Sequence, residues 1–232
     1  MITSSSHTVL IERINEILQT DFIKNLMNNS ENNKVKAEIN QPTGNFFYDP
    51  WVIKKEFQNT VFEYLLNSLP HPVGEARFIV LKPGSCYHSH ADIDDRYHLN
   101  IQGQYSYLID LENSTMFPTN ADGQWYEMDA GVRHVASNFG SINRIQLVVR
   151  KLLKQNQLND PTSVKVNYAG PTVEKFRFIF DDKVSPWLNR ACKNNIINNF
   201  KTDQKQIWFD IEKTELMKLK ATLGEEFNIE EV

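Results

Sequence analysis

The apolar residues of this chain follow two different spacings. Near the N-terminus they recur at helical intervals and predict an amphipathic helix over about residues 8–20. A polar loop follows at 28–34, and helical periodicity returns over 56–69, where a Pro-rich turn ends it. Two helices are therefore expected in the first third of the chain.

From residue 75 the spacing changes to the alternation that is typical of β-strands. Short runs rich in β-branched and aromatic residues are divided by clusters of Gly, Asn, Asp and Pro. The runs cover 75–81, 96–103, 105–111, 124–130, 134–139 and 144–153. Several short strands at this spacing predict a sandwich or a small barrel.

The last part of the chain has a mixed pattern. The run at 173–182 is compatible with a strand, whereas 187–200 and 214–227 have helical periodicity. We therefore divide the chain into residues 1–154, which hold the N-terminal helices and the β-rich core, and an extension at 155–232 that packs on this core.

Composition and charge exclude several classes of partner. Of the 232 residues, 41% are hydrophobic and 23% are charged, which is typical of a folded globular protein. The formal net charge is −4 at pH 7, and the sequence contains no polybasic segment. A nucleic acid or an anionic membrane is therefore not expected as a partner.

The two cysteines and the N-terminal residues indicate the compartment. Cys86 and Cys192 are far apart and form neither a CxxC pair nor a disulfide framework. The N-terminal residues lack the basic start and continuous apolar core of a signal peptide, and no stretch approaches the ~20 apolar residues that span a bilayer. We expect a reducing compartment and a cytoplasmic location.

Residues 86–103, CYHSHADIDDRYHLNIQG, combine β-type alternation with a cluster of ionisable side chains. In an extended strand, residues two apart point to the same side, so His90 and Asp92 can offer an imidazole nitrogen and a carboxylate oxygen to one point. The only histidine beyond residue 103 is His134. Two histidines and one carboxylate on one side of a metal suit non-haem Fe(II). The candidate metal ligands are therefore His90, Asp92 and His134.

An arginine follows the last of these histidines within an apolar run. Arg144 stands ten residues after His134 and begins RIQLVV. An arginine is costly to bury unless its guanidinium meets a carboxylate. Between the two residues lies NFGSIN, in which Asn, Gly and Ser favour a turn. We expect this turn to fold Arg144 back toward the metal ligands.

Two segments, PGSCYHSHADIDDRYHLNIQG and YEMDAGVRHVASNFGSINRIQLVV, resemble a known family. They are similar to the aspartyl/asparaginyl β-hydroxylases, a family of Fe(II)- and 2-oxoglutarate-dependent oxygenases that includes bacterial free-proline hydroxylases. The resemblance covers about residues 78–150. It is carried by a Pro-Gly turn, an HxD motif, an Arg-x-His motif, and a histidine followed ten residues later by an arginine.

The resemblance implies a mainly β fold, a double-stranded β-helix (jelly roll, cupin-like), with flanking α-helices that buttress one sheet. It implies that His90, Asp92 and His134 hold Fe(II) and that Arg144 pairs the distal carboxylate of the co-substrate 2-oxoglutarate. The implied reaction uses dioxygen to hydroxylate an unactivated C–H bond and releases succinate and CO2. The protein would position the reactants and exclude water.

The resemblance also implies roles for the residues between the two ligand motifs. Arg96 and His98 match the Arg-x-His motif and would line the co-substrate pocket. Asp94 and Asp95 place two more carboxylates beside Asp92, so the sequence leaves open which aspartate binds iron.

The segments outside the resemblance carry no motif that identifies the substrate. Because the chain is short and has no peptide-repeat or targeting module, we expect a free amino acid or a similar small molecule. A peptidyl Asp, Asn or Pro side chain is the second expectation.

A different interpretation starts from His88, which precedes His90 by two positions. GVRHVASN is similar to the second motif of metal cupins, so an isomerase or dioxygenase that does not use 2-oxoglutarate could bind its metal through His88, His90 and His134. Arg96 and Arg144 argue against this cupin, because it has no need of paired arginines. A third interpretation, a metal-free cupin-like binding module, would leave the HxD motif as a surface pair.

Overall fold

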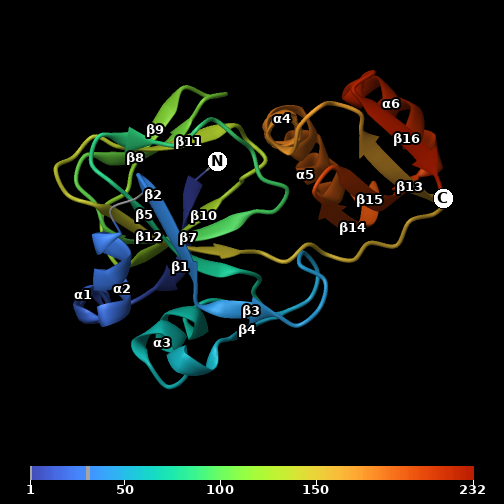
Figure 1. Ribbon diagram of the computed structural model, residues 1–232. Helices are drawn as coiled ribbons and strands as arrows, with labels where there is room; N and C mark the ends of the chain where they lie inside the picture. The colour runs from blue at the N-terminus through green and yellow to red at the C-terminus, as the bar shows by residue number, and fades with distance from the viewer. Residues whose placement is uncertain (1, 30–31) are drawn as a thin grey trace.

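The computed structural model of the protein describes residues 2–29 and 32–232 (Figure 1). Its first part contains a six-stranded and a four-stranded antiparallel sheet. In order across the larger sheet, the strands are β1 (Ile2–Thr8), β10 (Gln124–Met128), β7 (Arg96–Gln102), β12 (Arg144–Arg150), β5 (Ala76–Leu81) and β2 (Lys34–Glu38). Those of the smaller sheet are β6 (Ser85–Cys86), β11 (His134–Asn138), β8 (Ser106–Asp110) and β9 (Thr115–Pro118). The prediction of a mainly β protein with helices is confirmed.

The six-stranded sheet is buried on both faces. All seven residues of β12 are buried, as expected for a central strand that alternates between two covered faces. One face packs against three helices, α1 (Ile11–Gln19), α2 (Asp21–Asn28) and α3 (Val61–Asn67), in a shared hydrophobic core (Figure 1). The connections between α2 and β5 include β3 (Asn40–Pro42), β4 (Trp51–Ile53) and the 3-10 turn η1 (Lys55–Phe57).

The other face of this sheet lies opposite the four-stranded sheet. Side chains of both sheets line one cavity, with Leu108 and His134 from the smaller sheet and Arg96, His98 and Val148 from the larger one. The space between two facing sheets is therefore the place where the chain can build an interior site. Two antiparallel sheets in this arrangement agree with a jelly roll, and the double-stranded β-helix stays a prediction.

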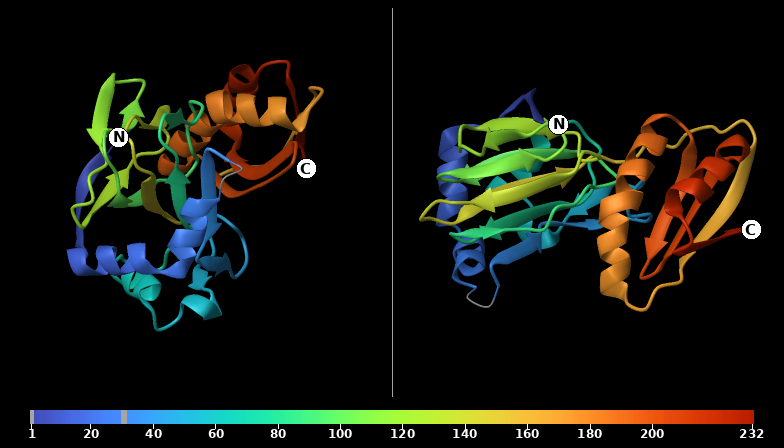
Figure 2. Two further views of the ribbon diagram at one scale, coloured as in Figure 1. Left: turned by 60° about the vertical axis from the view of Figure 1, so that its left-hand side comes forward. Right: turned by 90° about the horizontal axis from the view of Figure 1, so that it is seen from above.

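The C-terminal part forms a third antiparallel sheet with its own helices. The strands are, in order, β14 (Ile197–Asp203), β15 (Gln206–Glu212), β13 (Pro161–Tyr168) and β16 (Phe227–Glu231). The helical segments are α4 (Val173–Ile179), the π-helical turn η2 (Phe180–Val184), α5 (Ser185–Lys193), the 3-10 turn η3 (Lys213–Glu215) and α6 (Leu216–Leu223). Helices α4 and α5 lie between this sheet and the first part of the chain (Figure 2). The Ala91 amide donates to the Asp181 carbonyl at 3.1 Å, so η2 lies against the segment that carries the candidate ligands.

Three sequence-based expectations for the helices are wrong in part. The run at 173–182 is helical, because Phe176 and Ile179 are buried at helical spacing and the Thr172 hydroxyl accepts a hydrogen bond from the Lys175 amide as an N-cap. The helix expected over 187–200 ends at Lys193 and gives way to β14. The C-terminal helices pack on their own sheet rather than on one of the first two.

The N-terminal helix is shorter than expected, because Ile2–Thr8 pairs with β10 as an edge strand. Within 2–29 and 32–232, no helix has the length and apolar character needed to cross a bilayer.

Candidate metal centre

Two of the predicted ligands lie outside regular strands. His90 and Asp92 belong to the connection between β6 and β7, so the expected extended strand is wrong for this segment. A single β-bridge fixes its position: the His90 amide donates to the His134 carbonyl at 3.1 Å, and the His134 amide donates to the His90 carbonyl at 2.8 Å. This bridge holds both imidazoles side by side on the inner surface of the smaller sheet.

The structure brings His90, Asp92 and His134 together. Asp92 Oδ2 lies 3.9 Å from His90 Nε2 and 3.8 Å from His134 Nε2. One ligand atom from each residue lies within 4.8 Å of the other two. The three side chains are 17%, 23% and 7% exposed, so the group is not a surface pair. Three donor atoms at these separations can bind one metal ion and leave its remaining positions open.

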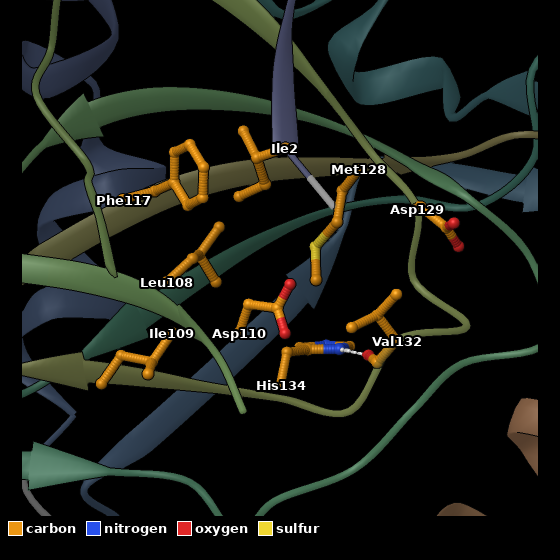
Figure 3. A pocket seen from close by; sticks show the side chains of 9 residues that line it. All are labelled: Ile2, Leu108, Ile109, Asp110, Phe117, Met128, Asp129, Val132 and His134. Carbon is orange, nitrogen blue, oxygen red and sulfur yellow. Dashed lines mark hydrogen bonds between the residues drawn. The ribbon is translucent and has the colours of Figure 1, made fainter. Parts of the chain in front are cut away.

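Backbone carbonyls orient both imidazole rings. His90 Nδ1 lies 3.1 Å from the His88 carbonyl, and His134 Nδ1 lies 2.8 Å from the Val132 carbonyl (Figure 3). A carbonyl can only accept, so Nδ1 carries the proton in each ring and Nε2 presents its lone pair toward Asp92. Burial lowers the pKa of His90 to about 4 and the pKa of His134 below its usual value. Both rings are therefore neutral at pH 7, which is the form that binds a metal.

An arginine keeps the third ligand ionised. Arg96 Nη2 lies 2.8 Å from Asp92 Oδ1, on the opposite carboxylate oxygen to the one that faces the histidines. Burial by itself would raise the pKa of Asp92, but Arg96, His90 and His134 outweigh it and hold that pKa well below its usual value. The guanidinium therefore orients the carboxylate and leaves Oδ2 in a position where it could bind a metal ion.

Asp94 and Asp95 have other partners. These partners decide which aspartate can bind a metal, a question that the sequence left open. Asp94 accepts hydrogen bonds from Arg150 Nη2 at 2.7 Å and from Arg96 Nη2 at 3.1 Å. Asp95 Oδ1 lies 2.9 Å from Lys193 Nζ. Asp92 is therefore the aspartate that can bind a metal.

Arg144 is fully buried, and its hydrogen-bond partners are three uncharged side chains. Its guanidinium donates to Gln146 Oε1, to Thr119 Oγ1 at 3.3 Å and to the Tyr87 hydroxyl at 3.3 Å. Among residues 2–29 and 32–232, no carboxylate lies within 4.0 Å of it. The Tyr87 ring is 5.9 Å from the ring of His90, so the turn at 139–143 does bring this cation close to the metal ligands. A buried guanidinium without a carboxylate is costly unless a bound anion pairs with it.

The Arg-x-His residues line the cavity in front of the ligands, but only one of them has a free polar atom there. Arg96 is engaged by the two aspartates described above. His98 is 6% exposed, its Nδ1 lies 3.4 Å from Gln146 Oε1, and its Nε2 has no hydrogen-bond partner within the described part of the chain. Burial, then Arg144 and Arg96, lower the pKa of His98 to about 3. His98 is therefore neutral, and its Nε2 can accept a hydrogen bond from a bound molecule.

Two basic residues at this cavity were missed by the sequence analysis. Burial lowers the pKa of Arg77 to about 10, and its Nε has no partner among the residues described. Lys34 Nζ lies 3.7 Å from the centre of the Tyr87 ring. Arg77 could have been found, because it interrupts an apolar strand in the same way as Arg144. Lys34 gives no such signal, since it follows a polar loop.

His88 does not join the metal group. Its side chain is 66% exposed, and its Nε2 lies 3.5 Å from Asp181 Oδ2. The ligand set that the cupin interpretation requires, His88 with His90 and His134, is therefore not assembled.

Comparisons with known proteins give weak similarities to solved structures only. No protein-family model and no curated protein matches the chain. Among solved structures, the chain is similar to an oxidoreductase of the 2OG-Fe(II) oxygenase family from Burkholderia pseudomallei, with a TM-score of 0.38 and 9% sequence identity. The similarity covers 56% of this chain and 75% of that chain. A likeness of this size carries no weight in assigning a function.

Proposed function

We propose that this protein is an Fe(II)- and 2-oxoglutarate-dependent dioxygenase that hydroxylates a C–H bond of an amino acid or a similar small molecule. The observation that carries the proposal is the convergence of His90 Nε2, His134 Nε2 and Asp92 Oδ2 within 4.8 Å of one another. Two neutral imidazoles and one carboxylate on one side of a metal are the ligand set of non-haem Fe(II) oxygenases.

The donor set fits Fe(II) better than it fits a closed structural site. Among residues 2–29 and 32–232 three side chains converge, so the remaining metal positions stay available for bound reactants. When bound, the iron supplies the oxidative decarboxylation of 2-oxoglutarate to succinate and CO2 that drives hydroxylation. The protein holds the two imidazoles through backbone carbonyls and the carboxylate through Arg96, so the ligands are oriented before the metal binds.

Arg144 supports 2-oxoglutarate as the co-substrate. Its buried guanidinium has no carboxylate partner in the part of the chain that the structure describes, and it reaches the ligand group through Tyr87. A dicarboxylate that binds the metal at one end can place its other carboxylate on this guanidinium in a charge-assisted pair. A cupin that does not use 2-oxoglutarate would leave this buried charge without a role.

The same proposal includes the double-stranded β-helix as the fold and a relation to the aspartyl/asparaginyl β-hydroxylases and free-proline hydroxylases. It also includes a free amino acid as the substrate. A peptidyl Asp, Asn or Pro side chain is the alternative substrate.

Anaerobic titration tests the proposal. The purified metal-free protein is mixed with Fe(II) and then with 2-oxoglutarate, and the weak visible charge-transfer band of a keto acid chelated to Fe(II) is followed. We expect the band in the native chain and its absence in Asp92→Ala and His134→Ala, both of which should also lose succinate formation.

His88→Ala is the matched control, because His88 adjoins the site without facing the metal group. It should keep the band. Iron binding without a band in the native chain would contradict the use of 2-oxoglutarate, and loss of iron in His88→Ala would restore the cupin ligand set.

A further inference from the structure

Helix α5 of the C-terminal part lies against both chain segments that carry the candidate ligands (Figure 2). One is the connection that holds His90 and Asp92, and the other is the turn at 129–131 that precedes His134. The two segments meet where the Asp92 amide donates to the Ala130 carbonyl at 2.7 Å. Neither segment is a regular strand, so most of its polar groups depend on other parts of the chain for their partners.

The segment that holds the first two ligands alternates between two environments. His90 and Asp92 face the metal group, as described above. Between and after them, Ala91 and Ile93 are buried against the C-terminal part. The Ala91 amide donates to the carbonyl of Asp181 in η2 at 3.1 Å, and the Ile93 side chain belongs to the hydrophobic core of the C-terminal sheet. One side of this segment therefore carries the ligands, and its other side is held by the C-terminal part.

Asn189 of α5 contacts both ligand-bearing segments. Its side chain is buried, and its Nδ2 donates to the Ile93 carbonyl at 2.8 Å and to Asp95 Oδ1 at 3.3 Å. Its Oδ1 lies against the turn at 129–131, because a Cβ added to Gly131 would lie only 2.3 Å from it. Glycine is therefore the residue that lets this turn approach α5 so closely.

Lys193 makes the same connection one helical turn later. Its Nζ lies 2.9 Å from Asp95 Oδ1 and 2.8 Å from Asp129 Oδ1, so it bridges the two ligand-bearing segments with its charge. Residues at positions i and i+4 lie on the same side of a helix. Asn189 and Lys193 therefore present one side of α5 to both segments.

We propose that Asn189 and Lys193 are positioning residues, which hold Asp92 and His134 at the separation that the metal requires. The proposal rests on the metal centre of the function proposed above, and it gives the C-terminal part a role in that centre, although none of the three candidate ligands lies on α5. Groups that orient metal ligands contribute about 10–100-fold to metal affinity. Loss of either residue should therefore weaken metal binding.

Titration with Co(II) tests this proposal without any turnover. The metal-free full chain is titrated with Co(II) alone, and binding is followed by its visible d–d bands, which also report the ligand geometry. In Asn189→Ala we expect the Kd for Co(II) to rise roughly tenfold. Asn40→Ala is the matched control, because Asn40 is equally buried and its Nδ2 donates to the Gly74 carbonyl at 2.8 Å, outside both ligand-bearing segments. Both variants should lower the midpoint of urea denaturation, but Asn40→Ala should keep the native Kd.

A second pair of variants keeps the proposal testable if Asn189→Ala does not fold. The side chain of Lys193 is 40% exposed, and that of Lys218, which pairs with Glu215 at 2.7 Å, is 70% exposed, so either lysine can be replaced without opening the core. Removing a positive charge by itself favours a bound cation. A several-fold higher Kd for Co(II) in Lys193→Met would therefore report the loss of positioning, and Lys218→Met should leave the Kd unchanged.

The results that would overturn the proposal differ from those that would refute the proposed function. A native Kd for Co(II) in Asn189→Ala, or in Lys193→Met where Asn189→Ala does not fold, would overturn the positioning role. An equally large rise in Asn40→Ala would also overturn it, because the effect would then follow stability alone. A native chain that binds Co(II) but shows no 2-oxoglutarate band with Fe(II) would refute the dioxygenase function, while the variants would still decide the positioning role. A native chain that does not bind Co(II) would refute both.

Discussion

Replacing Arg144 by methionine separates the two contributions that this buried guanidinium makes. Its hydrogen bonds to Gln146, Thr119 and Tyr87 reach uncharged acceptors, whereas the proposed interaction with 2-oxoglutarate pairs two opposite charges. The substitution Arg144→Met keeps an unbranched apolar side chain and removes the charge and the donors together with the end of the side chain.

The affinity for 2-oxoglutarate should fall much more than the stability of the fold. A hydrogen bond to a charged group contributes about 1.5–3 kcal/mol, so loss of the pair should cost about 3 kcal/mol, or roughly 150-fold in Kd. The free energy of unfolding should change by less than about 2 kcal/mol, because three acceptors lose a donor while a buried, uncompensated charge disappears.

Two measurements on the same variant check this reasoning. The Kd comes from anaerobic titration of the Fe(II) protein with 2-oxoglutarate, and the free energy of unfolding comes from urea denaturation of the metal-free protein. Arg77→Met is the matched control, since Arg77 lines the cavity at the candidate metal ligands but has Glu75 as an acidic partner. If Arg77→Met weakens 2-oxoglutarate binding more than Arg144→Met does, the assignment of Arg144 is refuted.

Two further predictions concern stability. Asp94→Ala should lower the free energy of unfolding, measured by urea denaturation, by about 3–5 kcal/mol. The reason is that Arg96 and Arg150 stay buried without the carboxylate that they share. A loss below about 1 kcal/mol would contradict this prediction. The metal-free protein should lose stability as the pH falls below about 6.5, since the pKa of about 3 for His98 lies below its value in the unfolded chain and the unfolded state takes up the proton first. Between pH 7 and 5, protonation of this histidine in the unfolded chain should lower the free energy of unfolding by about 2 kcal/mol. If the free energy of unfolding of His98→Gln has the same pH dependence as that of the native chain, this contribution is refuted.

The β-rich segments between residues 75 and 150 were predictable because short runs of β-branched and aromatic residues bounded by turn-forming residues are a local property of the sequence. The same pattern was overlooked in β15, where buried residues alternate along Gln206–Glu212. The run at 173–182 was assigned wrongly, because a short apolar run fits a strand and a buried helix equally well.

The sequence by itself determined the chemistry that is available: two histidines, a run of aspartates and an arginine in an apolar strand. Only the tertiary structure decided which aspartate faces the imidazoles, because Arg150 and Lys193 come from distant segments to engage Asp94 and Asp95. It also decided that Arg96 pairs with Asp92 and that Arg144 meets only uncharged acceptors among the described residues. Charge pairing in a protein interior depends on which groups meet there within a few ångströms, and spacing along the chain does not fix those distances.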